Sequence, residues 1–131
     1  MQILVDADAC PVKEIILQIA KRRNIPVTMF IDRAHELNDG YSHVVTVEKG
    51  KDSADRALEW DVKSGDLVIT QDYKVAAIAL EKGARALNQD GFIYTHENID
   101  RILNDGHHIP HMRTAEDDDK FEKAFLSQLK Q

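Results

Sequence analysis

The chain has 131 residues, of which 43% are hydrophobic and 31% are charged. These values are typical of one soluble globular domain, expected to span residues 1–131 and to bury a core without disulfides. The formal net charge of −6 argues against a protein that coats nucleic acid by bulk electrostatics, but not against an enzyme acting on nucleic acid. No apolar stretch approaches the ~18 residues of a membrane span, and the start resembles no secretory signal. The single cysteine, Cys10, fits a reducing cytoplasm, so we expect a cytoplasmic protein with no membrane partner.

Strand-like and helix-like patterns alternate over the first two thirds of the chain. Short, largely β-branched runs predict strands at 2–5, 27–31, 43–47, 66–70 and 84–87. Apolar residues at helical spacing predict helices at 11–23, 53–62 and 73–82. Pro11 suits a first helical turn, and Gly83 stands where a helix should end. The polar stretch 32–42 is expected to be a loop.

The last third of the chain is less regular. We expect a turn and short strand at 91–95, a helix at 97–103 and a C-terminal helix at about 116–130. The stretch 105–119, rich in His, Gly, Pro and Asp, is the most loop-like part. The alternation as a whole predicts an α/β fold, a compact three-layer sandwich in which helices cover both faces of a mostly parallel sheet.

Two aspartates, Asp6 and Asp8, stand where the first strand ends and the first helix begins. In open α/β sheets, ligands bind at the carboxyl ends of the strands. Two acidic groups so close together repel each other unless they share a cation or a proton. The pair therefore indicates a metal site or a site of phosphate chemistry, with a costly helix cap as the alternative.

Three more aspartates follow later strands. Asp52 and Asp55 come after the third strand, and Asp72 comes directly after the fourth. Because the carboxyl ends of parallel strands lie at one edge of a sheet, we expect these acids to gather near Asp6 and Asp8. Carboxylate oxygens suit a hard cation such as Mg²⁺ or Mn²⁺, which can activate water and clamp phosphate oxygens. The sequence thus predicts a five-aspartate metal site.

Asp52 and Asp55 have a simpler interpretation when they are taken alone. Asp52 can cap the following helix, and Asp55 gains from the positive end of the helix dipole. The convergence of the strand ends is what favours the metal site over this interpretation.

Four residues near the aspartates are candidates to bind a substrate phosphate. Thr70 and Lys74 flank Asp72 and offer a hydroxyl donor and a positive charge. Lys13 and Lys51 can supply a basic rim to the site, although solvent-facing charge is the simpler explanation of scattered lysines.

Cys10 and a histidine-rich tract are weaker candidates. No histidine lies near Cys10 in the sequence to act as a base, so we expect a small buried packing residue rather than a nucleophile. His107, His108 and His111, followed by the acidic run 117–119, match no zinc-binding spacing, which favours a polar loop.

Several runs resemble one protein family. The run VDADACPVK at 5–13 resembles the signature of the YaiI/YqxD family of uncharacterised bacterial proteins. The runs GKDSAD at 50–55 and GDLVITQD at 65–72 resemble its Gly-x-Asp-x-Ala-Asp and Gly-Asp-hydrophobic-Thr-x-Asp segments. The run KGA at 82–84, with Leu87 and Asn88, resembles the turn that follows. The resemblance covers about residues 3–103 in the right order.

This resemblance implies a fold and a chemistry. The family is similar to the PIN-like and NYN group of metal-dependent ribonucleases, which hold a divalent cation with aspartates on a compact α/β sheet. The site implied by position is formed by five residues, Asp6, Asp8, Asp52, Asp55 and Asp72. Asp6, Asp8, Asp55 and Asp72 would hold Mg²⁺ or Mn²⁺ and support catalysis, Asp52 would be a ligand or an outer-shell residue, and RNA would be the substrate.

Two other functions stay open from the sequence. The first is phosphoryl transfer on a small molecule with Asp6 as the nucleophile, as in the haloacid-dehalogenase phosphatases; it leaves Asp52 and Asp55 without a role. The second is a non-enzymatic module that binds nucleic acid or a protein, because fold alone does not determine function.

Overall fold

The computed structural model describes residues 1–7, 10–32, 39–47, 53–105 and 114–129, without the side chains of 32, 53–55 and 103–105. Within these residues lie six strands and five helices. The strands are β1 (Ile3–Asp6), β2 (Val27–Asp32), β3 (His43–Val47), β4 (Leu67–Ile69), β5 (Arg85–Leu87) and β6 (Ile93–Tyr94). The helices are α1 (Lys13–Arg22), α2 (Ser53–Asp61), α3 (Tyr73–Glu81), α4 (His96–Asp105) and α5 (Ala115–Leu129). The expected elements are thus all present, with bounds shifted by a few residues.

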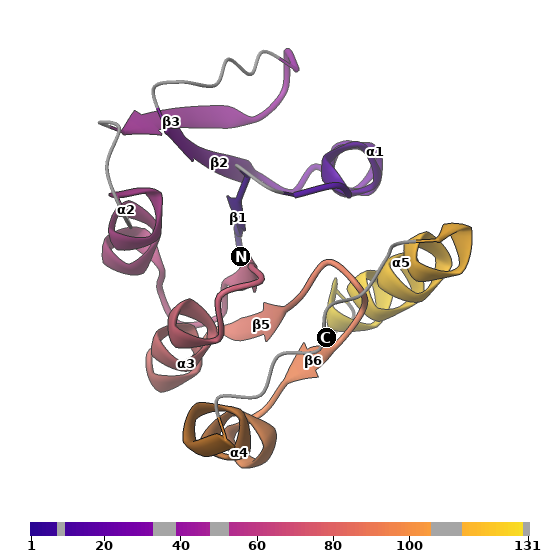
Figure 1. The fold of residues 1–131 in the computed structure, drawn as a ribbon. Helices are drawn as coiled ribbons and strands as arrows, with labels where there is room; N and C mark the ends of the chain where they lie inside the picture. Colours follow the sequence, from indigo (N-terminus) through magenta and orange to yellow (C-terminus); the bar gives the residue numbers. More distant parts are fainter. Residues whose placement is uncertain (8–9, 33–38, 48–52, 106–113, 130–131) are drawn as a thin grey trace.

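The strands form a single sheet in the order β3-β2-β1-β4-β5-β6 (Figure 1). All the pairs among β1 to β5 are parallel, and the pair of β5 and β6 is antiparallel. β6 has this direction because the turn between Leu87 and Ile93 is too short for a crossover connection, whereas it suits a hairpin. The predicted mostly parallel sheet is confirmed.

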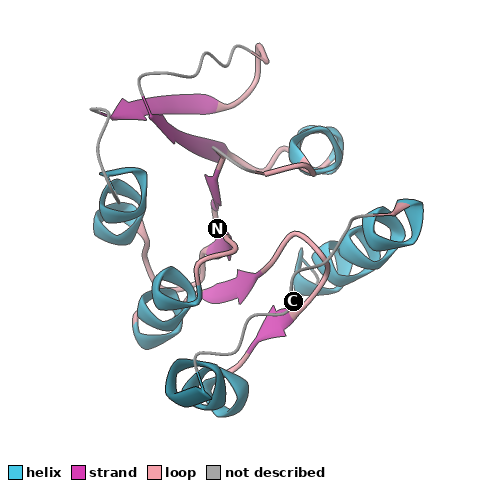
Figure 2. Cartoon of the chain, in the orientation of Figure 1, coloured by secondary structure: helices cyan, strands magenta, loops and turns pink. Residues whose placement is uncertain are grey.

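Helices cover both faces of this sheet. α1 and α5 lie on one face, and α2, α3 and α4 lie on the other (Figures 1 and 2). Two buried clusters correspond to these faces: an α1/α5 core that includes Ile3, Val5 and Phe121, and an α2–α4 core that includes Leu4 and Val68. The layers are therefore helix, sheet and helix, as the alternating pattern predicts.

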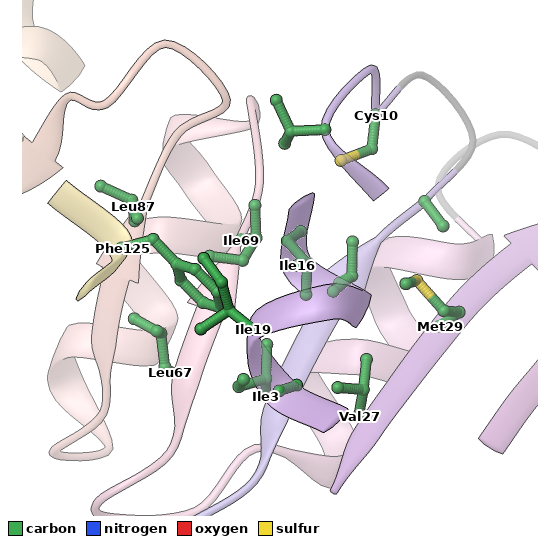
Figure 3. Packing of buried hydrophobic residues seen from close by; sticks show 14 of the residues in the cluster. Ile3, Cys10, Ile16, Ile19, Val27, Met29, Leu67, Ile69, Leu87 and Phe125 are labelled. Carbon is green, nitrogen blue, oxygen red and sulfur yellow. The ribbon is translucent and has the colours of Figure 1, made fainter. Parts of the chain in front are cut away.

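The α1/α5 core is built from the apolar stripe of α1 and the aromatic side chains of α5. Ile16 and Ile19 of α1 lie in one cluster with Ile69 of β4 and Phe125 of α5, on the same face of the sheet (Figure 3). Cys10 lies at the end of this cluster and is 7% exposed, so the prediction of a buried packing residue is confirmed. Within the described residues, no helix is long and apolar enough to cross a membrane.

The acidic run 117–119 lies within α5, which confirms the helix expected from about residue 116 and corrects the expectation that this run belongs to a polar loop. α5 begins at Ala115, and Asp117 is buried because its carboxylate accepts hydrogen bonds from the Thr114 backbone N–H, at 2.7 Å, and hydroxyl, at 3.3 Å. This is a capping arrangement, in which a side chain satisfies an N–H at the helix start. His107, His108 and His111 lie outside the described residues.

Candidate functional site

The carboxyl ends of β1 and β4 meet at the point where the chain changes direction across the sheet. From β1 the chain moves outward to β2 and β3, and then returns to the other side of β1 to form β4 and β5. The helix after β1 lies on one face of the sheet and the helix after β4 lies on the other. In open α/β sheets such a switch point opens a crevice in which ligands bind. Asp6 and Thr70 stand at these two strand ends.

A hydrogen-bond chain joins the two strand ends. The Thr70 hydroxyl donates to Asp6 Oδ2 at 3.2 Å and accepts from the Asp72 backbone N–H at 3.0 Å. Thr70 is 2% exposed, whereas Asp6 is only half-buried. The buried hydroxyl therefore fixes the Asp6 carboxylate from below and leaves part of it at the surface of the edge.

Strand alternation decides which face this chain of hydrogen bonds occupies. Leu4 and Val68 point into the α2–α4 core, and side chains two residues further along each strand share their face. Asp6 and Thr70 therefore lie on the side of the sheet that α2 and α3 cover. Asp72, at the start of α3, belongs to the same side.

α2 brings a further acidic residue to this side. β3 ends at the carboxyl edge and β4 begins at the amino edge, so α2, which connects them, runs from the first edge to the second. Asp55 lies in the first turn of α2, and the helix packs against β1, β2 and β3. The backbone thus puts Asp55 near the edge that Asp6 occupies. The side chain of Asp55 lies outside the part of the chain that the structure describes, and so do the whole residues Asp8, Lys51 and Asp52.

Asp72 is the N-cap of α3. Its Oδ1 accepts a hydrogen bond of 2.8 Å from the Lys74 backbone N–H, and its backbone is extended, as caps require. The described contacts of Asp72 are those of a helix cap, a role that the sequence analysis did not give it. They are compatible with the predicted metal ligand, because one carboxylate can cap a helix with one oxygen and bind a cation with the other.

Asp72→Asn and Asp72→Ala should separate the cap from the charge. Asn caps helices as well as Asp does, so Asp72→Asn should keep the free energy of unfolding within about 0.5 kcal/mol, whereas Asp72→Ala should lose about 1 kcal/mol. Urea unfolding measures both. If Asp72→Asn destabilises as much as Asp72→Ala, the negative charge rather than the cap stabilises this helix.

Tyr94 is a residue of this site that the sequence analysis missed. It is 6% exposed, and its hydroxyl donates to the Thr70 carbonyl oxygen at 3.4 Å. Burial, together with the charges of Asp72 and Asp90, raises the pKa of Tyr94 to about 12, although a hydrogen bond with the Asn88 side chain lowers it. The phenol therefore stays neutral at ordinary pH. Nothing in a lone tyrosine of a two-residue strand signals this position beforehand.

Tyr94→Phe should change how stability depends on pH. The raised pKa means that the folded protein keeps a proton that the unfolded chain, with a pKa near 10.0, releases first. Stability is therefore complete below pH 10 and falls as the pH rises toward 12, by about 2 to 3 kcal/mol at most. Urea unfolding of both proteins between pH 9 and pH 12 checks this, because only the difference between them belongs to Tyr94. Parallel pH curves for the two proteins would contradict the shift.

Two of the candidate lysines, Lys13 and Lys74, lie in the described residues and have different surroundings. Lys13 is half-buried, and its ammonium donates to the Ala7 carbonyl oxygen at 3.2 Å, beside the segment that carries Asp8. Lys74 is exposed in the first turn of α3. Their role in substrate binding stays a prediction. Thr70 uses its hydroxyl proton on Asp6, so it acts on the site through that carboxylate.

Buried Asp66 shows what a purely structural acid looks like in this fold. It lies at the opposite, amino edge of the sheet and is 5% exposed. Its carboxylate accepts hydrogen bonds from the Gln2 backbone and side chain, at 3.2 Å each, and from the Lys63 backbone at 2.9 Å. Its oxygens thus bind the protein's own donors, whereas Asp6 is half-buried at the edge where ligands bind.

A match to a family model decides the relationship of the chain to known proteins. Residues 4–131 match the model described as "Uncharacterized BCR, YaiI/YqxD family". The chain belongs to the YaiI/YqxD family. A UPF0178 protein of Ruminiclostridium cellulolyticum is 54% identical to it, with 99% of this chain and 93% of the relative covered. The UPF0178 protein of Alkaliphilus oremlandii is 48% identical, with 98% and 91% covered.

Further members are similar over nearly their whole length. The UPF0178 protein CA_C2825 of Clostridium acetobutylicum is 45% identical, with 95% of this chain and 94% of the relative covered. No solved structure matches the chain. The predicted family membership is confirmed, and the YaiI/YqxD relatives carry names that state no activity.

Among the residues whose side chains are described, no group of three His, Cys, Asp or Glu could hold a metal ion. Asp6 and Asp72 are the two predicted ligands in that part of the YaiI/YqxD chain. A cation at this edge therefore requires Asp8, Asp52 or Asp55 as well. The donors that the edge offers are carboxylate oxygens, which fit a hard cation rather than zinc or copper.

Proposed function

We propose that this protein is a single-domain cytoplasmic nuclease that depends on Mg²⁺ or Mn²⁺ and cleaves RNA. We further propose that its fold is of the PIN-like and NYN type. The strand order and the two helical layers support this proposal, because they bring the ends of β1 and β4 to one switch point.

One observation carries the proposal. The Asp6 carboxylate is half-buried at the switch point and is held by the Thr70 hydroxyl, on the face of the sheet that α2 covers with Asp55 in its first turn. Asp66, at the other edge of the sheet, is only 5% exposed, whereas Asp6 is half-buried at the carboxyl edge, where we expect the other predicted acids to gather. Such an arrangement favours a bound cation, since the carboxylates otherwise repel each other.

The residues have separate roles in this proposal. Asp6, Asp8, Asp55 and Asp72 hold the cation directly or through water, and Asp52 is a ligand or orients one. Thr70 is a positioning residue, because it acts through Asp6. When bound, the cation would lower the pKa of water and neutralise charge on the scissile phosphate. Lys13, Lys51 and Lys74 would attract the phosphates that flank the cleaved bond.

A cleavage assay tests the function. Labelled single-stranded RNA is incubated with the purified protein in Mn²⁺, in Mg²⁺ and in EDTA, beside Asp8→Asn and Asp61→Asn. Asp61→Asn is a matched control because Asp61 ends α2, at the end of the helix away from Asp55. We expect cleavage by the wild type and Asp61→Asn in either metal, none in EDTA and little by Asp8→Asn. Equal cleavage by the wild type and Asp8→Asn would refute the proposal.

A further inference from the structure

The turn at 88–92, between β5 and β6, lies at the same edge as the aspartates. β5 is parallel to β4, so its last residue, Leu87, reaches the carboxyl edge, where its carbonyl accepts from the Thr70 N–H at 3.0 Å. The side chains of Gln71 and Gln89 are hydrogen-bonded to each other. The turn is therefore attached to the segment that connects Thr70 to Asp72.

Phe92 ends this turn with its ring in solvent. Phe92 is 43% exposed, although large aromatic side chains usually bury most of their surface. Its ring meets the buried ring of Tyr94 edge-on, with centroids 5.4 Å apart and planes at 84°. Tyr94 in turn binds the Thr70 carbonyl, so Phe92 is two contacts away from the residue that holds Asp6.

The turn holds Phe92 in a fixed position. Asn88 Oδ1 accepts from the backbone N–H groups of Asp90, at 2.9 Å, and Phe92, at 2.8 Å, and the Asn88 N–H donates to the Phe92 carbonyl at 2.9 Å. Gly91 has a φ of +88°, and a Cβ there would lie 2.7 Å from the Lys120 carbonyl oxygen of α5. Only glycine fits this contact, which packs the turn on α5. A ring fixed in this way loses little freedom when a ligand stacks on it.

The charges around Phe92 select the part of a nucleotide that can bind there. Asp72 and Asp90 are near enough to Tyr94 to raise the pKa of its hydroxyl, so this corner of the edge is acidic. An acidic corner repels a phosphate unless a cation intervenes, but a neutral base carries no such penalty. Of the lysines that suit phosphates, Lys13 begins α1 on the other face of the sheet, and Lys74 follows Asp72 in the first turn of α3.

We infer that Phe92 is a stacking platform for one nucleobase of single-stranded RNA whose phosphate lies at Asp6. This inference rests on the proposed function and adds to it the class of substrate, an unpaired strand. A base in a duplex is already stacked on both sides, whereas an unpaired base can lie on an aromatic side chain. The platform accepts any base, because every base has a π-face.

Binding of a fluorescein-labelled single-stranded RNA decamer, in Ca²⁺ to limit cleavage, tests the inference by fluorescence anisotropy. Phe92→Leu keeps an apolar side chain but removes the ring, and it should weaken binding about tenfold. Phe92→Tyr keeps the ring and should bind within twofold of the wild type. Trp60→Ala is the matched control, because Trp60 is 87% exposed in the last turn of α2, toward the amino edge, and should leave binding unchanged.

Two results would overturn the inference. The first is that Phe92→Leu binds the decamer within twofold of the wild type. The second is that Phe92→Leu loses as much affinity for an abasic decamer, which offers no base to stack, as for the normal decamer. Thermal melting of Phe92→Leu confirms that the variant is folded. The outcome is separable from the nuclease proposal. If Phe92→Leu loses binding while no RNA is cleaved in Mn²⁺, the platform stands and the nuclease fails. If RNA is cleaved and Phe92→Leu binds normally, the nuclease proposal stands and the platform fails.

Discussion

Asp6→Asn is expected to lower metal-dependent RNA cleavage by at least about 100-fold. Replacing a residue that only orients a metal ligand typically costs 10–100-fold in affinity or activity, and we assign Asp6 to the metal itself. The substitution should not disturb the fold, since the amide oxygen of Asn can accept the same hydrogen bond from the Thr70 hydroxyl. Initial rates on labelled RNA at several Mn²⁺ concentrations measure the loss.

The dependence of the cleavage rate on Mn²⁺ concentration distinguishes an Asp6 that binds the metal from an Asp6 that acts without binding it. If Asp6 binds the metal, saturating activity should need more Mn²⁺ in Asp6→Asn than in the wild type. Thr70→Val, which removes the hydroxyl that holds Asp6, should show a smaller change in the same direction. A rate for Asp6→Asn within threefold of the wild-type rate would contradict the assignment of Asp6.

Phe121→Ala is expected to destabilise the protein by about 3 to 5 kcal/mol. Phe121 is 0% exposed, and its ring stacks on Phe125 with centroids 5.4 Å apart and planes at 16°. Both rings belong to the α1/α5 core, so Phe121→Ala would leave a cavity that the sheet cannot collapse to fill. Because domains of this size are stable by only about 5–15 kcal/mol, urea unfolding should show a large shift of the midpoint.

Two further variants serve as comparisons for the stability loss of Phe121→Ala. Phe121→Leu keeps most of the volume and should lose less than Phe121→Ala. Trp60→Ala removes an aromatic side chain that is 87% exposed, and should change stability by less than about 0.5 kcal/mol. A loss below 1 kcal/mol for Phe121→Ala would mean that α5 contributes little to the core. It would also weaken the argument that α5 holds the 88–92 turn through Gly91.

The sequence predicts the elements of this fold better than their arrangement. Strands 43–47 and 27–31 are recognised because β-branched runs between turns have few other interpretations. Nothing local says that β1 lies between β2 and β4, because strand order depends on which long-range pairings bury most apolar surface. The start of α5 is predicted to within one residue, but its capping is not, since Asp117 looks in the sequence like one more charge in an acidic run.

The sequence predicts only part of the candidate site. Strand ends give the positions of Asp6 and Asp72, because all parallel strands end at one edge. The role of Asp72 as a helix cap and the bond from Thr70 to Asp6 are side-chain geometry, which residue order does not determine. Tyr94 and Phe92 lie near the edge because β6 runs back antiparallel to β5, and the strand pattern of 91–95 alone does not show which of its side chains reach the site.

Titration of the protein with Mn²⁺ by calorimetry is the most direct test of the central claim, that aspartates from separate parts of the chain share one cation. We expect saturable binding to the wild type and to Asp61→Asn, and binding at least about tenfold weaker in both Asp6→Asn and Asp72→Asn. We expect the loss in both variants because Asp6 and Asp72 lie at the ends of different strands, β1 and β4. Equal Mn²⁺ binding by the wild type, Asp6→Asn and Asp72→Asn would contradict the shared site.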